Sequence, residues 1–272
     1  GSWEDRFTYD YVKNKYDKAV LSGKIETFNQ ELMLRIMSEE DRMIQDSDIS
    51  WYKLDNVLQN KGKFNFYITT DFATSVKQSA DFSVISVWAY NNVGDWLWVD
   101  GICKRQLMDA NLDDLFRLAQ LYKPQSVGIE VTGQQGGFIQ WIQSQMMTRN
   151  IYFPLATEGN DSKPGIRPNT NKMVRFNTVV PLFKAKKMFF PEEKKKEVPL
   201  QEALNELGLA SVSGFRSKHD DFIDTVSMLG SLIPWKPSEE APMVESKESS
   251  GGGLWDLDIE PETMDRRASY IV

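Results

Sequence analysis

Carboxylates hold the positions best suited to chemistry in this 272-residue sequence. Asp71 follows a short aromatic and β-branched run, and Glu130 follows a second such run and precedes a glycine-rich stretch. Asp220, Asp221 and Asp224 open the last strongly periodic segment. Sites in open α/β sheets form at strand ends, so we expect these acids to meet if the first and fourth strands are neighbours.

Neighbouring carboxylates repel one another unless a cation neutralises them. Oxygen ligands without histidine or cysteine favour Mg²⁺ or Mn²⁺. Two such ions, roughly 3.5–4 Å apart, are a common arrangement for phosphodiester hydrolysis, which needs no protein nucleophile. The acids therefore predict a site for two divalent cations.

Each acid also has an ordinary structural interpretation. Acids in the first turn of a helix cap it and interact favourably with its dipole, which would explain Asp221 and Asp224. Asp71 would then be a turn residue, and Glu130 a surface acid at a strand end. The coincidence of all of them at converging element ends favours the metal site.

The composition excludes several other kinds of site. A single cysteine, Cys103, rules out an internal disulfide, and with a single histidine, His219, it rules out a Cys/His zinc site. No apolar run approaches the roughly 20 residues that span a bilayer, and no signal peptide is recognisable at the start. A hydrophobic content of 41% indicates a folded core. We therefore expect a soluble protein of a reducing compartment, neither secreted nor embedded in a membrane.

The charge is distributed unevenly along the chain. The net charge is −7, but residues 163–196 hold ten Lys and Arg against two acids. Such a block is typical of a phosphate-backbone contact, although a solvated lysine face is the plain alternative. Lys172 and Arg175, three residues apart on an expected helix, are the best candidates to point toward the acids. The further DNA-contact candidates are Lys184, Lys186 and Lys187.

Hydrophobic patterning predicts an α/β fold. The expected strands are 64–70, 82–90, 96–102, 126–130 and 151–155, and the expected helices are 111–122, 138–149, 171–187 (interrupted by Pro181), 198–207 and 219–233. Short turn chemistry at 91–94 makes the second and third strands a hairpin. The helical crossovers that follow imply parallel pairing, so we expect a mixed sheet flanked by helices.

Three parts are expected along the chain. Residues 1–60 read as a helical linker or N-terminal extension, and residues 61–235 as the main domain. Residues 236–272, with Pro, Ser, Gly and nine acids against four basic residues, read as a disordered acidic tail.

Four stretches together resemble a known family. They are residues 3–7 (WEDRF), 28–31 (FNQE), 70–75 with 80–83 (TDFATS and ADFS) and 219–225 (HDDFIDT). Their order resembles the ribonuclease H-like superfamily, and more narrowly the nuclease domain of the large terminase subunit of tailed bacteriophages. The resemblance implies a ribonuclease H-like mixed sheet, with three antiparallel strands followed by parallel ones.

The resemblance also implies an activity. Terminase nucleases are Mg²⁺- or Mn²⁺-dependent endonucleases that cut concatemeric viral double-stranded DNA during genome packaging. Carried onto this chain, the catalytic metal ligands are Asp71, Glu130 and Asp221. Resolvase-like relatives favour Asp221 with Asp224 assisting, and which of Asp220, Asp221 and Asp224 bind metal stays open. His219 is a candidate proton shuttle, with a helix-start residue as the plainer interpretation.

Partners follow from the same resemblance. Residues 3–7 and 28–31 resemble the end of an ATPase domain and its linker, yet the chain contains no G-x-x-x-x-G-K-[ST] phosphate loop. The expected partners are double-stranded DNA, the protein's own ATPase domain, the portal protein and the small terminase subunit, with no membrane. The expected location is the host bacterial cytoplasm and, transiently, the procapsid portal. Residues 157–196 occupy the place of a family loop that governs DNA access.

Three other functions compete with this one. A resolvase- or transposase-like nuclease of the same superfamily would share the acids but not the linker motifs. A non-catalytic DNA-binding or assembly module would share the basic block but show no dependence on divalent ions. A nucleotide-binding α/β protein rests on Gly133, Gly136 and Gly137, whose spacing does not match G-x-G-x-x-G.

Overall fold

The computed structural model of the chain describes residues 41–73, 82–131 and 136–242, together with four single helical positions between residues 14 and 21. The linker motifs at 3–7 and 28–31 lie outside the described residues. The same holds for most of the loop at 132–137 and for the tail beyond residue 242.

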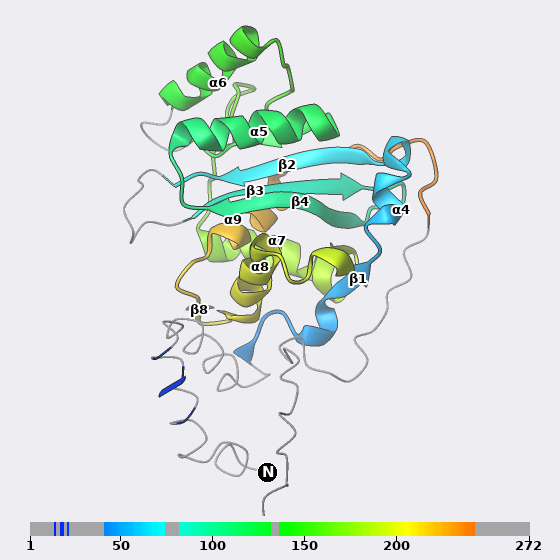
Figure 1. Cartoon of the computed structure of the whole chain (residues 1–272), viewed down its shortest axis with the longest axis vertical. Helices are drawn as coiled ribbons and strands as arrows, with labels where there is room; N and C mark the ends of the chain where they lie inside the picture. The colour runs from blue at the N-terminus through cyan, green and yellow to red at the C-terminus, as the bar shows by residue number, and fades with distance from the viewer. Residues whose placement is uncertain are drawn as a thin grey trace, which may run out of the picture.

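A six-stranded mixed sheet forms the centre of the fold, in the order β1-β6-β4-β3-β2-β5 (Figure 1). Its central strands are β2(Asn65–Asp71), β3(Ser83–Tyr90), β4(Trp96–Lys104) and β5(Ser126–Gly128). The first three pair antiparallel, and β5 pairs parallel with β2. Leu155 continues this order through a parallel bridge to Val127. The predicted mixed sheet, with three antiparallel strands followed by a parallel one, is therefore confirmed, including the adjacency of the first and fourth strands.

Two further strands extend the sheet beyond β4, and the sequence patterning did not predict them. β6(Met188–Pro191) pairs parallel with β4, and β1(Ser50–Tyr52) pairs parallel with β6. β1 lies within the segment 1–60 that was expected to be an extension, and it is the edge strand of the sheet. A three-residue strand is too short to show a hydrophobic period.

Helices and a small hairpin complete the fold. With η for 3₁₀ helices, these elements are η2(Asp46–Asp48), α4(Asp55–Leu58), η3(Lys61–Lys63), α5(Met108–Tyr122), α6(Gly136–Arg149), α7(Lys172–Lys184), η5(Glu192–Lys194), α8(Val198–Gly208), β7(Ala210–Ser211), β8(Gly214–Phe215), α9(Asp221–Ser227) and η6(Met228–Ser231). Among the described residues, no helix has the length and apolar character needed to cross a membrane.

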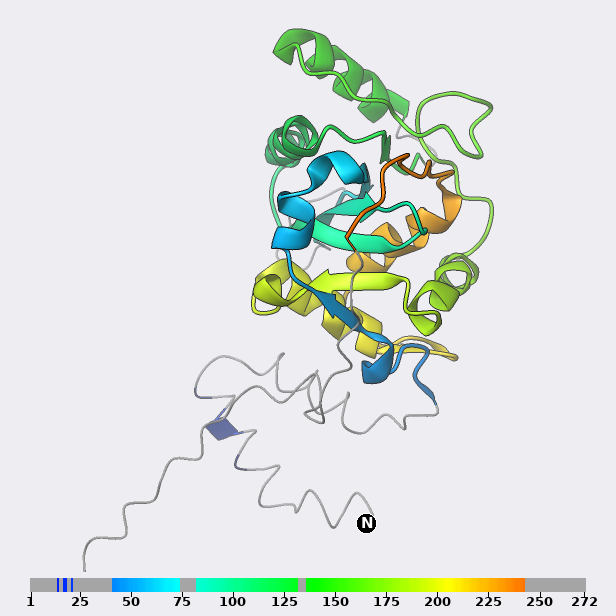
Figure 2. The same ribbon diagram turned by 90° about the vertical axis from the view of Figure 1, so that its right-hand side faces the viewer.

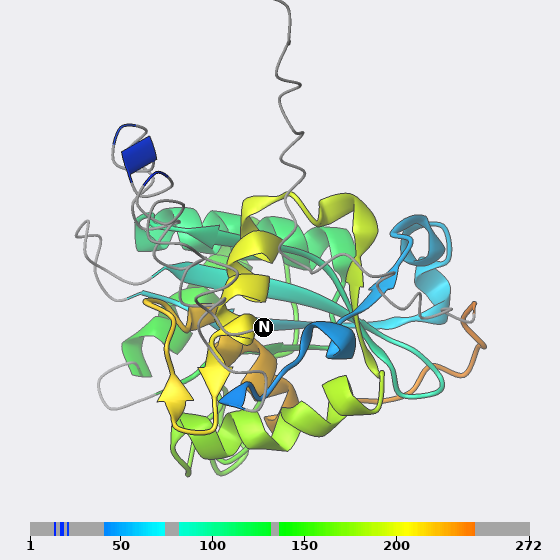
Figure 3. The ribbon, with the colours of Figure 1, turned by 90° about the horizontal axis from the view of Figure 1, so that it is seen from below.

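The helices cover both faces of the sheet, as the two side views show (Figures 1 and 2). α5 and then α6 lie over one face, while α7, α8 and α9 lie over the other; Figure 3 shows α7 and α8 crossing that face. Successive strand residues point to opposite faces. On β3, Ile85 and Val87 pack with the α5 side, and Val84 and Trp88 pack with the α9 side. Each face therefore has its own hydrophobic core.

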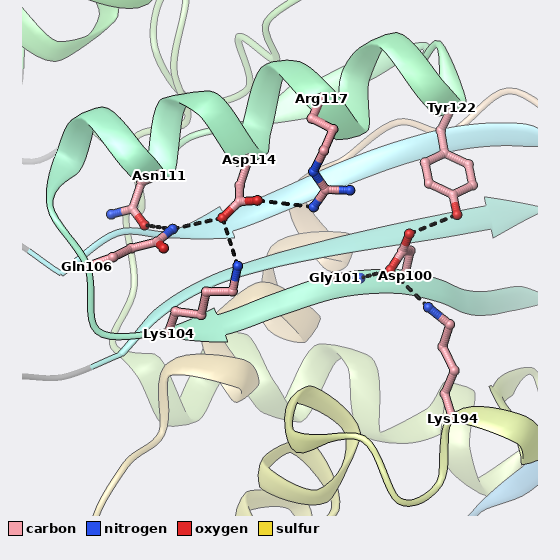
Figure 4. A network of polar contacts seen from close by, with 9 residues as sticks. All are labelled: Asp100, Gly101, Lys104, Gln106, Asn111, Asp114, Arg117, Tyr122 and Lys194. Carbon is pink, nitrogen blue, oxygen red and sulfur yellow. Dashed lines mark hydrogen bonds and ion pairs between the residues drawn. The ribbon is translucent and has the colours of Figure 1, made fainter.

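A polar network attaches α5 to β4 (Figure 4). Tyr122 at the end of α5 and Lys194 both donate hydrogen bonds to Asp100, each at 2.9 Å. Asp114, nearer the start of α5, accepts hydrogen bonds from Lys104 at 3.2 Å and from Gln106 at 2.9 Å. These contacts hold α5 in position against the face of the sheet.

Three predicted elements differ from the observed ones. The strand expected at 151–155 is reduced to the single bridge at Leu155, because Pro154 has no N–H to donate to a ladder. The interruption expected at Pro181 is absent, since α7 continues to Lys184. The last helix is shorter than 219–233, because α9 ends at Ser227 and the chain continues as η6 to Ser231.

Candidate metal centre

Asp71 is the last residue of β2, and its position is fixed from both sides. On one side Thr70 Oγ1 donates to the Gly128 carbonyl at 2.9 Å, which ties the end of β2 to β5. On the other side the Ala73 N–H donates to Ser83 Oγ at 3.1 Å. Asn111, a fully buried residue of α5, donates to the same hydroxyl at 2.7 Å. The backbone that carries Asp71 is thus held by β3, β5 and α5.

Glu130 lies two residues beyond β5, beside a segment that returns from the loop 157–171. The Ile166 N–H donates to the Ile129 carbonyl, and the Val131 N–H donates to the Ile166 carbonyl, both at 2.8 Å. Gly128 at the end of β5 leaves room for η6, because a Cβ there would lie 2.5 Å from Met228 Sδ. The absence of a side chain at Gly128 therefore lets the last helical segment approach the strand that leads to Glu130.

α9 carries the third group of acids against β2 and β3. Its first turn is capped by Glu206 of α8, whose Oε2 accepts from the Ile223 N–H at 2.9 Å. Asp221, 5% exposed, accepts from the Phe82 N–H at 3.0 Å. Thr225 shares a 2.9 Å hydrogen bond with Ser86 of β3. The helix is therefore fixed with its N-terminal acids at the sheet end that carries Asp71.

Asp71 meets the acids of α9 directly. Its side chain faces that of Asp224 closely enough for the two carboxyl groups to interact. Burial, together with the charges of Asp224 and Asp221, raises the pKa of Asp71 well above its ordinary value. Burial also raises the pKa of Asp224, although Lys172 and Arg175 oppose this. The structure thus brings together three of the acids that the sequence singled out.

Two cations join the remaining acids to this group. Lys172 Nζ lies 2.6 Å from Asp220 Oδ1 and 2.6 Å from Asp224 Oδ2. Arg175 Nη1 lies 3.0 Å from Glu130 Oε2, and its Nη2 lies 3.5 Å from Asp224 Oδ1. Burial works against the charged form of Lys172, but Asp224 and Asp220 outweigh it and raise the pKa of the ammonium group. We call Asp71, Glu130, Asp220, Asp221 and Asp224 the acidic cluster, and Lys172 with Arg175 the cation pair.

The cation pair lies on the first turns of α7. The Asn171 side chain accepts from the Val174 N–H at 2.9 Å and caps this helix. Residues three apart share a helix face, which directs Lys172 and Arg175 toward the cluster together. The sequence expectation that these two residues point toward the acids agrees with their observed contacts.

The other three basic candidates lie elsewhere. Lys184 forms an ion pair with Asp48 at the far end of α7, about 18 Å along the helix axis from Lys172 at 1.5 Å per residue. Lys187 donates to the Val93 carbonyl at 3.0 Å and pairs with Asp95 at 3.1 Å, in the turn between β3 and β4. Lys186 lies between them, with φ at 56°. The structure does not bring these lysines to the acidic cluster.

His219 lies behind Asp221. Its Nδ1 is 3.9 Å from Asp221 Oδ2, and its Nε2 is 3.1 Å from Arg105 Nη2. A guanidinium can only donate, so Nε2 accepts in this contact and a neutral ring carries its proton on Nδ1, toward Asp221. Phe82 packs edge-on against the ring at 4.7 Å between centroids. His219 therefore lies beside Asp221, too far away for a hydrogen bond between Nδ1 and Oδ2.

Sequence reasoning did not find two of the supporting residues. Arg105 directly follows β4, at the same sheet end as Asp71, so the strand-end argument would have found it if applied to the third strand. Glu206 has no such signal, because it lies within an amphipathic helix and its burial is decided by α9 packing against it.

The chemical nature of the donor atoms in the acidic cluster suits a hard divalent cation. The cluster offers only carboxylate oxygens, the ligands that Mg²⁺ and Mn²⁺ prefer. Asp224 Oδ1 is buried and accepts no hydrogen bond within the described part of the chain. The positions of these side chains are less suitable: among the described residues, no three His, Cys, Asp or Glu side chains are grouped so that they could hold an ion. The cation pair lies among the acids instead.

Known proteins resemble this chain only distantly. No protein-family model and no curated protein matches the chain. A solved structure of the human cytomegalovirus terminase nuclease domain, soaked with Mn and bound to an inhibitor, is similar at a TM-score of 0.47 and 16% identity, over 67% of this chain and 89% of that one. The large terminase nuclease of thermophilic phage G20c with bound cobalt is similar at 0.45 and 15%, over 71% and 98%. Identities this low concern the fold alone.

Proposed function

We propose that this chain is the nuclease domain of a viral large terminase subunit, which hydrolyses phosphodiester bonds of concatemeric double-stranded DNA with Mg²⁺ or Mn²⁺. The observation that carries the proposal is the meeting of Asp71 with Asp221 and Asp224 at one end of the sheet, with Glu130 joined to them through Arg175. Grouped carboxylates of raised pKa, buried at a strand end, are typical of a functional site.

In this proposal Asp71, Glu130 and Asp221 hold two divalent ions, and Asp224 or Asp220 assists. When bound, such ions would lower the pKa of an attacking water and stabilise the leaving 3′ oxygen. The chain itself fixes the carboxylates through the Thr70, Ser83 and Glu206 contacts. The Phe82 N–H holds Asp221, and the N-terminal turn of α7 supplies positive charge for the phosphates.

Plasmid cleavage tests the proposal. The purified protein should nick supercoiled plasmid with Mn²⁺ or Mg²⁺ in the absence of ATP and should stop when EDTA is added. Asp71→Asn and Asp221→Asn should abolish cutting while leaving the circular dichroism spectrum unchanged. Asp113→Asn is the matched control, since Asp113 is exposed and pairs with Arg149 away from the cluster. Wild-type cutting by Asp71→Asn would refute the proposal.

One observation favours a second candidate, a non-catalytic DNA-binding or assembly module. The cation pair forms ion pairs with the acids, and a salt-bridge network with a purely structural role would look the same. Such a module predicts no heat of Mn²⁺ binding in calorimetry and no divalent-dependent activity. A resolvase-like nuclease would instead prefer branched over linear duplex, which a cleavage assay on both substrates distinguishes.

The wider context belongs to the same proposal. The ATPase domain of a full-length terminase would precede the linker, and the portal protein and small subunit would be partners during packaging. Residues 41–43 pair with the β7–β8 hairpin, through Met43 N–H to the Ala210 carbonyl at 2.9 Å. The end of the N-terminal segment is thus attached beside α8 and α9, and the division of the chain at residues 60 and 235 stays a prediction.

A further inference from the structure

Lys172 and Arg175 occupy the places between carboxylates that a bound cation would take. Lys172 bridges Asp220 and Asp224, and Arg175 bridges Glu130 and Asp224. Both side chains are mostly removed from solvent, with 26% and 18% of their surface exposed. Their charges are therefore screened much less by salt than those of a surface pair.

We infer that the cation pair is an internal counter-ion, which a divalent cation displaces from the acidic cluster, and that the displaced side chains then bind DNA phosphates. This inference rests on the proposed function, because it takes the cluster to be a metal site. It assigns Lys172 and Arg175 two successive positions rather than one permanent phosphate contact.

The contacts of Arg175 support displacement over a permanent structural role. A buried guanidinium that serves stability usually has its donors satisfied. Here Arg175 Nε is buried without a hydrogen-bond partner in the described residues, and Nη2 is 3.5 Å from Asp224 Oδ1, longer than a good charged hydrogen bond. The acceptor opposite it, Asp224 Oδ1, is also left without a hydrogen bond. The pairing of Arg175 with Asp224 is therefore electrostatic, without a well-formed hydrogen bond.

The backbone would not need to move. Asn171 caps α7, and the buried Phe176 and Val179 hold its next turns in the core. Only the long side chains of Lys172 and Arg175 have to change rotamer, and such flips are fast. The displaced Lys172 and Arg175 side chains would remain next to the acidic cluster, where they could bind a DNA phosphate.

Displacement couples the two ligands. A divalent cation that takes the carboxylates frees the cation pair for phosphate, and a phosphate that attracts the cation pair frees the carboxylates for metal. By linkage each ligand then raises the affinity for the other by the same factor. Metal and DNA would accordingly bind more tightly together than either binds alone.

Calorimetric titration of Mn²⁺ without DNA tests the inference. Lys172→Gln and Arg175→Gln remove charge while keeping most of the side-chain length, and each should tighten the Mn²⁺ dissociation constant by about tenfold. Lys184→Gln is the control on the same helix, because its partner Asp48 lies outside the cluster, and it should leave the constant unchanged. A permanent phosphate contact predicts no tightening, so unchanged or weaker Mn²⁺ binding in both variants overturns the inference.

Asp71→Asn separates this test from that of the proposed function. If it abolishes Mn²⁺ binding while Lys172→Gln and Arg175→Gln leave it at the wild-type value, the metal site stands and the counter-ion role fails. If the wild-type protein binds no Mn²⁺, both fail. A second measurement guards against misfolded variants: Ca²⁺ should tighten binding of a short duplex several-fold in wild type and less in Lys172→Gln. Equal tightening in both proteins contradicts the inference.

Discussion

Asp71, the last residue of β2, faces Asp224 of α9 closely enough for the charge of Asp224 to raise the pKa of Asp71. Burial is the larger cause of this shift, and burial raises the pKa of Asp224 as well. In the metal-free protein, ionising these carboxyl groups is therefore unfavourable at the place where the proposed ions would bind.

Removing the charge of Asp71 should stabilise the metal-free protein. An acid whose pKa is raised by folding contributes stability at pH values below its ordinary pKa, and this contribution is lost as the pH rises toward the folded value. At pH 7 in EDTA we therefore expect Asp71→Asn to raise the free energy of unfolding by about 1–2 kcal/mol. Urea denaturation measures it.

The same variant should lose plasmid cleavage, so stability and activity move in opposite directions. Asp113→Asn, at an exposed site, should change both by little. A destabilised Asp71→Asn would mean that Asp71 has a favourable partner that outweighs its burial, and would argue against a charge-strained metal site.

Much of this site could be predicted from the sequence, because the acids are visible there and strand order brings them together. Asp71 and Glu130 end runs with strand patterning, and the parallel pairing of β2 with β5 follows from the helical crossover between them. The position of Asp221 at the start of α9 follows equally from the periodic stripe behind it.

The remainder depends on contacts that no local pattern encodes. β1 has three residues and β6 four, so neither shows a period, and β6 directly follows a lysine-rich stretch. The partners of Lys172 and Arg175 became clear only when α7 was seen packed beside α9. The close approach of Gly230 to Thr178 is likewise a contact between distant parts of the chain.

Glu206 should make stability depend on pH. It is fully buried, and burial raises its pKa well above the ordinary value, with Asp221 adding to the effect while the Ile223 N–H opposes it. Its contribution is therefore present below about pH 4.5 and is lost as the pH rises through the folded value. Glu206→Gln keeps an acceptor for Ile223 and should exceed wild type by about 1 kcal/mol or more at pH 8, with a smaller gap at pH 5.

Glu206→Ala provides the contrast. It removes the cap of α9 and leaves a cavity, so it should lower the free energy of unfolding by about 2–3 kcal/mol at pH 5, and by less at pH 8, where removal of the buried charge offsets part of the loss. Urea denaturation of both variants at pH 5 and pH 8 makes the comparison. A Glu206→Gln gap that is equal at the two pH values would show that charge is not the cause.

Asn111 should act on the site from a distance. It is fully buried and donates to Ser83 Oγ, which in turn accepts from the Ala73 N–H two residues beyond Asp71. Asn111→Ala should lower the free energy of unfolding by about 1–3 kcal/mol. Cleavage should also fall at temperatures where the variant is fully folded, because the chain after Asp71 loses its support. Full activity of the folded variant would limit Asn111 to a role in stability.

The lysines of the basic block should separate into two classes by their salt dependence. Lys172 lies at the acidic cluster, whereas Lys187 holds the β3–β4 turn through Val93 and Asp95. With Ca²⁺ present, Lys172→Ala should weaken duplex binding and reduce the slope of log K against log salt by about 1, as expected for one lost phosphate contact. Lys187→Ala should leave the slope unchanged and lower the free energy of unfolding by about 0.5–1 kcal/mol, since its ion pair is partly exposed. Fluorescence anisotropy between 50 and 200 mM salt, a range over which about 6–10 phosphate contacts change affinity strongly, makes the measurement. An equal loss of slope in both variants would instead place the DNA along the whole of α7 and the turn beyond it.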